Sequence, residues 1–176
     1  MMFILAMLVA AAAAYLVVAL AKRRPLTRGT AAFDAPAEVQ AAARQIGYRP
    51  KAASHPVDAI DDTALCVAAM ATAFAQMDQT TENATHERVA LALGKHLKLG
   101  TENAQAHATV GGWLAGQCDS PTSAFDRLTK RLKRLDHGPW FDRLMHVLGD
   151  VGRAKGMPSP QQADALGALA RVFRTA

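Results

Sequence analysis

The sequence predicts an all-α protein in which an N-terminal transmembrane helix precedes a six-helix bundle. Every one of residues 1–21 is apolar. The chain contains 38 alanines but only 14 valines and isoleucines together, and β-strands favour the β-branched residues that are scarce here. Capping residues, glycines and prolines recur at intervals that suit helices joined by short loops. The 176 residues therefore divide into an anchor and about one helical domain.

The apolar segment 1–21 is long enough to cross a bilayer, because a helix of this length extends roughly 31 Å and the hydrocarbon core is about 30 Å thick. No charge precedes it, whereas Lys22, Arg23, Arg24 and Arg28 follow it. The positive-inside rule thus predicts an N-out anchor in a bacterial-type inner membrane and a cytoplasmic C-terminal domain. The anchor's partner is membrane lipid, and its alanines leave homo-oligomer formation open. The alternative is a cleaved signal that releases a periplasmic bundle, but a basic n-region is missing.

Residues 22–56 form the predicted juxtamembrane linker, because proline, glycine, threonine and alanine dominate there. Within the linker, Asp34 as N-cap and Gly47 as stop allow a short helix. The apolar face of this helix, over residues 34–47, is mostly alanine. We therefore expect it to be weakly held.

The remaining residues, 57–176, form the predicted six-helix bundle. The first helix covers about residues 61–77 and places its apolar side chains on one face. The second begins near Thr85, which can cap it, and ends at Gly100. The third follows directly, over residues 101–117.

The last three helices begin at clear capping signals. Ser120 caps the fourth, with Pro121 at a position where the missing N–H costs nothing. The Gly-Pro pair at 138–139 opens the fifth helix, and Gly156 ends it. Residues 159–162, Ser-Pro-Gln-Gln, form a capping box that begins the sixth.

The core of this bundle has few large side chains, because alanine is so frequent. We expect close helix approach and modest stability. Gly111 and Gly112 beside Trp113 indicate such a helix crossing rather than a ligand platform. Cys66 and Cys118 fall within helical patterns, so we interpret them as small packed residues.

An internal similarity relates the first helical pair to the last, since residues 64–77 align with residues 140–154 and suggest a pseudo-repeated hairpin. Residues 140–166 combine an apolar helix, a polar turn and a capped helix. This order resembles the TerB-like domains of the tellurite-resistance family, which also occur in membrane co-chaperones of the DjlA type. The resemblance covers residues 57–175 and implies a TerB-like bundle behind a DjlA-like anchor. The chain lacks the His-Pro-Asp of a J domain.

In that family an Ala-Asp-Gly turn and a later acid are associated with divalent metal. The first copy here has Asp78 in the turn, with Glu82, His86 and Glu87 downstream, while the second copy reads Ala-Lys-Gly at 154–156. Only the first copy offers the carboxylates that a hard cation needs. The alternative is that both glutamates are N-terminal acids facing a helix dipole. We predict no metal site, and a metal-responsive sensor that uses the Asp78 turn is an alternative function.

Residues 126–136 form a basic amphipathic helix in a chain of net charge +5. Its leucines, with Phe125, share one side. The opposite side carries Arg127, Lys130, Lys133 and Arg134, with Arg131 at its margin. The candidate contact for an anionic surface consists of Arg127, Lys130, Arg131 and Arg134. The alternative is a solvated face that keeps the domain soluble. Nucleic acid is not an expected partner, because no aromatic residue alternates with the basic ones.

The sequence contains no nucleophile motif, no phosphate-cradling glycine loop and no His-Glu-x-x-His zinc motif. We therefore predict no enzymatic activity, no catalytic residue and no cofactor. The resemblance implies a membrane-anchored binding or scaffold protein in envelope-stress or chaperone-related processes. Its protein partner is not identified by the sequence.

Overall fold

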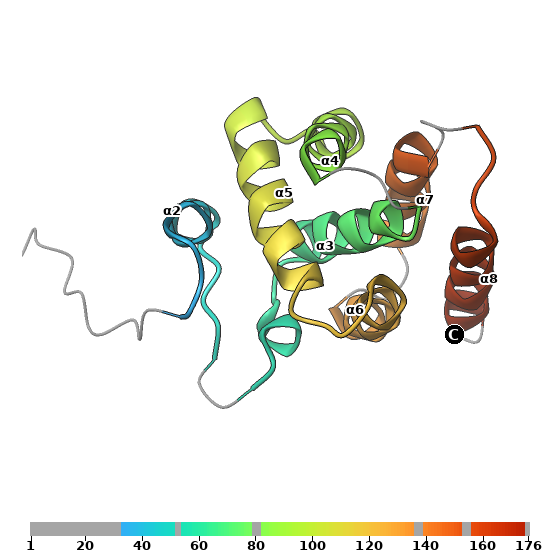
Figure 1. Ribbon diagram of the computed structural model, residues 1–176, viewed down its shortest axis with the longest axis horizontal. Coiled ribbons are helices and arrows are strands. Elements are labelled where there is room, and N and C mark those ends of the chain that lie inside the picture. The colour runs from blue at the N-terminus through green and yellow to red at the C-terminus, as the bar shows by residue number, and fades with distance from the viewer. Residues whose placement is uncertain (1–32, 52–53, 79–81, 136–138, 153–155, 175–176) are drawn as a thin grey trace, which may run out of the picture. The chain divides into compact units, whose positions relative to one another are not determined.

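The computed structural model describes residues 33–174, apart from 52–53, 79–81, 136–138 and 153–155. Within these residues every regular element is a helix and no strand occurs (Figure 1), as predicted. The elements are α2 (Ala37–Ile46), the short 3₁₀ helix η1 (Pro56–Ala59), α3 (Thr63–Gln76), α4 (Glu82–Leu97), α5 (Thr101–Ala115), α6 (Pro121–Leu135), α7 (Trp140–Gly152) and α8 (Pro160–Arg174).

The predicted membrane span, residues 1–21, lies outside the described residues. Among the helices that are described, none has both the length and the apolar character that crossing a membrane requires. The anchor therefore stays a prediction.

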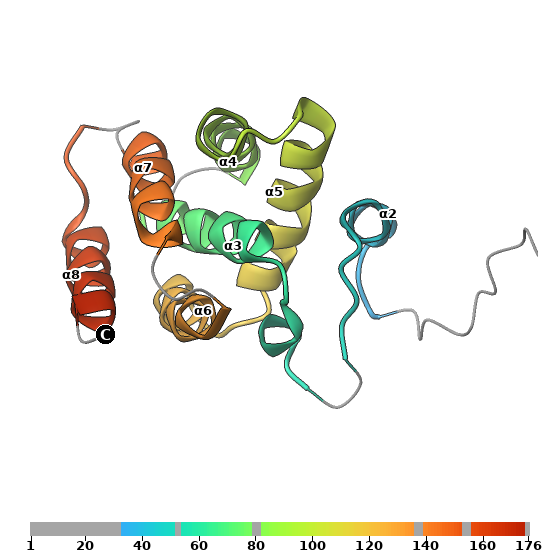
Figure 2. The same cartoon turned by 180° about the vertical axis from the view of Figure 1, so that it is seen from behind.

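The helix α3 lies at the centre of the bundle, against α4, α5, α6 and α7 (Figure 1 and Figure 2). Of its 14 residues, 12 are buried. We predicted a single apolar face, but small or apolar side chains surround this helix, as is typical of a fully buried one. The carboxylate of Asp62 caps its first turn and accepts hydrogen bonds from the N–H groups of Ala64 and Leu65 at 3.0 and 3.3 Å.

The helix α5 crosses α3 closely at Gly111, as the glycine pair predicted. Gly111 is buried in this crossing. Trp113, two positions further on, packs against the ring of Phe33, with 5.1 Å between the ring centroids. The tryptophan is thus a packing residue of the bundle.

Phe33, helix α2 and Tyr48 fall in the stretch 22–56 that we expected to be a linker, and they belong to the same compact unit as the bundle helices. Helix α2 packs against α5 and buries Val39, Ala42 and Ala43. The side chain of Tyr48 is only 4% exposed and donates a hydrogen bond to the Pro56 carbonyl at 2.9 Å. Tyr48 is thus a buried aromatic contact just after α2, and the strength with which the helix is held stays a prediction.

The ends of α2 match the sequence signals only in part. Gly47 ends the helix in the left-handed conformation, with φ of 75°, as predicted. The N-cap is Pro36 rather than Asp34, and no side chain caps this end. Instead, the side-chain amide of Gln40 donates a hydrogen bond to the Ala35 carbonyl at 2.9 Å and so fixes the residues that precede the helix.

The hairpins that we aligned as a repeat occupy different places in the bundle. Only four of the 13 residues of α7 are buried, whereas α3 is almost wholly buried. Helix α8 packs against α6. The predicted capping box of α8 is confirmed, since Ser159 and Gln162 exchange hydrogen bonds at 3.0 and 3.2 Å. Gln162 also donates to the Phe74 carbonyl at 2.9 Å and so connects α8 to α3.

Candidate functional site

Helix α6 has the amphipathic character that the sequence predicted. Its apolar residues Phe125, Leu128 and Leu132 are buried. The Oγ of Ser120 accepts a hydrogen bond from the N–H of Ser123 at 3.1 Å and caps the helix. Burial of one side leaves the cationic residues on the outer part of the helix.

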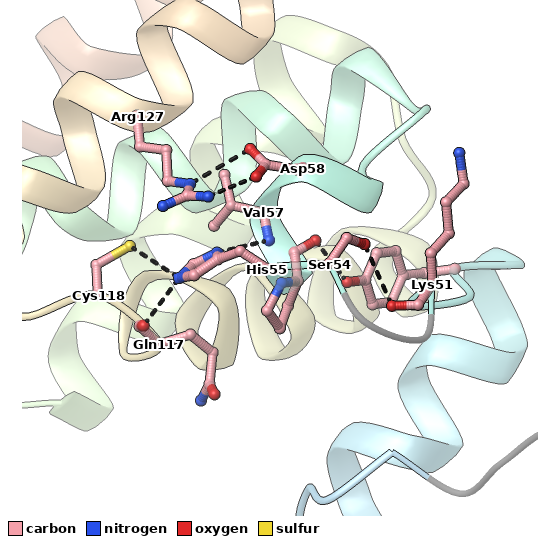
Figure 3. Close-up of polar contacts among 10 residues, drawn as sticks. Lys51, Ser54, His55, Val57, Asp58, Gln117, Cys118 and Arg127 are labelled. Carbon is pink, nitrogen blue, oxygen red and sulfur yellow. Dashed lines mark hydrogen bonds and ion pairs between the residues drawn. The ribbon is translucent and has the colours of Figure 1, made fainter.

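Arg127 forms a two-point ion pair with Asp58 of η1 (Figure 3). Its Nε donates to Oδ1 at 3.3 Å, and its Nη2 donates to Oδ2. The hydrogen bonds from Arg127 hold the pKa of the Asp58 carboxyl below its usual range, and the pKa of the guanidinium is raised in return. Both side chains are about 40% exposed, so the pair orients Arg127 more than it stabilises the fold.

Two further cations of α6 donate to backbone carbonyl groups. The Nε of Arg131 binds the carbonyl of Ile60, the residue that follows η1, at 2.6 Å. The Nζ of Lys133 binds the carbonyl of Val172, near the C-terminus of α8, at 2.7 Å, where a cation complements the helix dipole. Lys133 therefore helps to hold α8 and is not among the residues of the open basic face.

The structure brings the four predicted contact residues together in one open groove of about 720 Å³ along α6 and η1. Lys130 and Arg134 are exposed there and make no hydrogen bond or ion pair with the described residues. We name this feature the α6 groove, and its lining residues are Asp58, Ser120, Thr122, Ser123, Asp126, Arg127, Lys130, Arg131 and Arg134. With four cations and three hydroxyl groups, it can bind an anionic group.

A cysteine and a histidine also lie near η1 (Figure 3). The Sγ of Cys118 is 4.0 Å from the Nε2 of His55. The Nδ1 of His55 accepts from the N–H of Val57 at 3.3 Å, so Nε2 carries the proton and donates to the Gln117 carbonyl at 3.1 Å. Burial raises the pKa of the Cys118 thiol. In this arrangement Nε2 of His55 is a donor, and the raised pKa favours the thiol form of Cys118 over the thiolate.

The acidic turn does not form a metal centre in the part of the chain that the structure describes. Asp78 lies just after α3, half-buried, and Glu87 is exposed on α4. The Nε2 of His86 is 3.0 Å from the Oγ1 of Thr109 on α5. The side chain of Glu82 lies outside the described residues, and within them no three His, Cys, Asp or Glu side chains gather to hold a metal.

His107 belongs to a buried polar cluster that sequence reasoning missed. Its Nδ1 is 2.7 Å from the Asn103 carbonyl, and its Nε2 is 3.0 Å from the Oδ2 of Asp62. Both neighbours are hydrogen-bond acceptors, so the charged ring, with a proton on each nitrogen, can donate to both. Burial opposes this charge, but the hydrogen bonds to Asp62 and Asn103 outweigh it and raise the pKa of His107. Because 45 residues separate histidine and aspartate, no local pattern could have predicted the pair.

A second missed cluster joins α4 to α7. Lys95 and His96 each donate to the same oxygen of Asp150 at 2.7 Å. These hydrogen bonds, that from Lys95 first, lower the pKa of Asp150 to about 2. The ring of His146 stacks on that of His96, with the centroids 5.5 Å apart. The cluster connects two helices, and its hydrogen bonds to Asp150 come from residues 54 and 55 positions earlier in the chain.

Comparisons with known proteins identify no relative: no family model, no curated protein and no solved structure matches the chain. The assignment to the TerB-like family stays a hypothesis based on residues 140–166.

Proposed function

We propose that the chain is a non-catalytic, membrane-anchored helical module whose α6 groove contacts anionic lipid headgroups. The observation that carries the proposal is the convergence of Arg127, Lys130, Arg131 and Arg134 on one open groove. Two of these cations are oriented by protein acceptors, and the other two are exposed. The alternative of a purely solubilising face does not require such orientation.

The energetics of this contact suit a tethered protein. Each lysine or arginine near an anionic surface contributes about 1 kcal/mol, and salt screens the attraction. A few such contacts bind weakly on their own, so a second membrane signal is needed for stable attachment. The apolar segment 1–21 supplies that signal in our proposal, and it raises the effective concentration of the groove at the bilayer.

Photo-crosslinking of the full chain in lipid bilayers tests the contact. A benzophenone amino acid in place of Asp119, which is exposed beside the groove, should crosslink to lipid in anionic bilayers more than in zwitterionic ones. The same probe in place of Ala163, exposed on α8, is the positional control. Equal yields in both kinds of bilayer at position 119 would contradict the proposal.

Charge reversal provides the matched variants. Lys130→Glu with Arg134→Glu should abolish the anionic enhancement, because both side chains line the groove without a structural partner among the described residues. Arg44→Glu with Lys98→Glu changes the net charge equally at exposed positions outside the groove and should leave the crosslink intact. If both double variants lost the anionic enhancement of the crosslink equally, net charge alone would explain the enhancement.

The setting of this module follows from the resemblance and the predicted anchor. We propose a cytoplasmic scaffold that presents its helical unit to a protein partner in an envelope-stress or chaperone-related process. An alkaline phosphatase reporter fused after Ala176 should be inactive in a bacterial host. An active reporter would place the helical unit on the periplasmic side.

A further inference from the structure

The α6 groove contains two arginines whose positions are set by protein contacts. Asp58 binds Arg127 through Nε and Nη2, and the Ile60 carbonyl binds the Nε of Arg131. The terminal nitrogens of Arg131 have no hydrogen-bond partner among the described residues. A guanidinium held in this way has lost part of its rotamer freedom before any ligand binds. Its remaining donors are therefore preorganised.

The rest of the groove adds donors along the same side of α6. Lys130 and Arg134 follow Arg127 at i+3 and i+7, positions that share one helix face. Near the first turn of the helix, hydroxyl groups line the groove, and they belong to Ser120, Thr122 and Ser123. A ligand in the groove thus meets cations and neutral donors together.

The charge of the groove favours a dianion. Four cations and two carboxylates, Asp58 and Asp126, line it, which leaves an excess of two positive charges. A phosphomonoester carries about 1.5 to 2 negative charges at neutral pH, whereas a phosphodiester or a carboxylate carries one. The terminal oxygens of a phosphomonoester can also accept from both terminal nitrogens of Arg131 at once, in the bidentate geometry that arginine favours, while Arg127 uses its Nε and Nη2 on Asp58.

We infer that the α6 groove binds the terminal phosphate of a phosphomonoester headgroup, as in phosphatidic acid, in preference to phosphodiester headgroups. The inference rests on the proposed function, since it names the lipid that the basic face selects. An acidic peptide offers carboxylates with one negative charge each. These match neither the excess of two positive charges in the groove nor the two terminal nitrogens of Arg131. The lipid-borne phosphate is the source that fits a membrane-anchored chain.

Bilayers of different headgroup composition test the selectivity. The full chain with the benzophenone probe at position 119 is reconstituted with phosphatidic acid or with phosphatidylglycerol at matched surface charge. We expect the lipid crosslink to be about tenfold stronger with phosphatidic acid, the change that one charge-assisted hydrogen bond confers. Equal yields, both above the zwitterionic level, would overturn the phosphate inference and leave the lipid contact standing. Absence of any anionic enhancement would overturn the proposed function itself.

A conservative variant distinguishes the effect of the planar guanidinium from the effect of its positive charge. Arg131→Lys retains the positive charge but lacks the planar pair of terminal nitrogens. It should reduce the preference for phosphatidic acid and keep the general enhancement by anionic lipid. If Arg131→Lys kept the full preference for phosphatidic acid, the proposed role of the Arg131 terminal nitrogens would be overturned.

Soluble competitors distinguish the source of the phosphate. Glycerol 3-phosphate has the same monoester without acyl chains and should weaken the crosslink to phosphatidic acid only in large excess, and then by more than sodium chloride does through screening at equal ionic strength. Complete competition at a concentration equal to that of the lipid would assign the groove to a soluble phosphate and overturn the lipid assignment. Crosslinks to protein in place of lipid in native membranes would overturn it in favour of an acidic partner.

Discussion

Gly111 of α5 lies directly on the backbone of α3 at Ala69. A Cβ atom at position 111 would be 2.8 Å from the Ala69 nitrogen and 2.9 Å from the Ala68 carbonyl carbon. Backbone atoms in a packed helix cannot yield as a flexible side chain can. The crossing of the central helix therefore depends on the absence of one methyl group.

Gly111→Ala should lower the free energy of unfolding by about 1–3 kcal/mol, since overpacking outweighs the gain in helix propensity. Its neighbour is the matched control, because a Cβ at Gly112 would be 3.9 Å from the Cγ2 of Thr72, an ordinary contact. Gly112→Ala should leave stability unchanged or raise it slightly. Urea unfolding followed by circular dichroism measures both variants, and equal effects would contradict the assigned crossing.

The Asp62–His107 pair predicts a stability maximum in mildly acidic solution. The pKa of His107 is raised, so its contribution is complete below the unfolded value of about 6.5 and is lost as the pH rises through the folded value. The pKa of Asp62 is lowered, because hydrogen bonds from His107 and two backbone amides outweigh burial. Its contribution is present above about pH 3.9 and is lost as the pH falls through the folded value.

His107→Gln should remove the loss of stability on the alkaline side of this window. Below pH 6.5 it should cost about 1–3 kcal/mol, nearer the lower figure, because the Asp62 side chain is 45% exposed. Urea midpoints measured across the pH range check this. His146→Gln, at an exposed ring, should keep the alkaline decline, and a decline that persists in His107→Gln would exclude the pair as its cause.

Gln162→Glu should loosen α8 without removing its N-terminal cap. The carboxylate keeps the acceptor for the Ser159 N–H but loses the donor to the buried Phe74 carbonyl, a loss of about 1–3 kcal/mol. Hydrogen exchange of the α8 amides should accelerate. Gln161→Glu places the same charge at an exposed site in the same turn, where the helix dipole favours it. If both variants exchange alike, the bond to Phe74 does not hold the helix.

Tyr48→Phe tests the attachment of α2. The variant keeps the ring but removes the hydrogen bond to Pro56, so we expect a loss of about 1 kcal/mol. Burial raises the pKa of Tyr48 to about 12. Its contribution to stability is therefore present below about pH 10 and is lost as the pH rises toward 12. Ultraviolet titration should show a late phenol transition that is absent in Tyr48→Phe, where Tyr15 is the remaining phenol. The lack of a late transition in the unchanged protein would contradict the burial.

Features that depend on neighbouring residues were predicted well from the sequence. The caps at Ser120 and Ser159, the stop at Gly47 and the apolar side of α6 were all confirmed. Each depends on side chains within about one turn of one another, so the local order of residues is sufficient.

Most features that depend on distant residues were not predicted, and the close helix crossing at Gly111 is an exception. Three of the interactions join segments that are far apart in the chain. They are the aromatic contact of Phe33 with Trp113, the ion pair of Asp62 with His107 and the hydrogen bond from Lys133 to α8. Nothing in the local pattern distinguished Lys133 from the cations of the groove.

The sequence by itself determined the all-α class, the helix caps and the presence of a cationic side on α6. Only the tertiary structure decided that Phe33, helix α2 and Tyr48 pack with the bundle, and that Asp58 and Ile60 orient two of the arginines. The physical reason is that propensity and capping act over one helical turn, whereas burial and ion pairing depend on which surfaces meet when the helices pack.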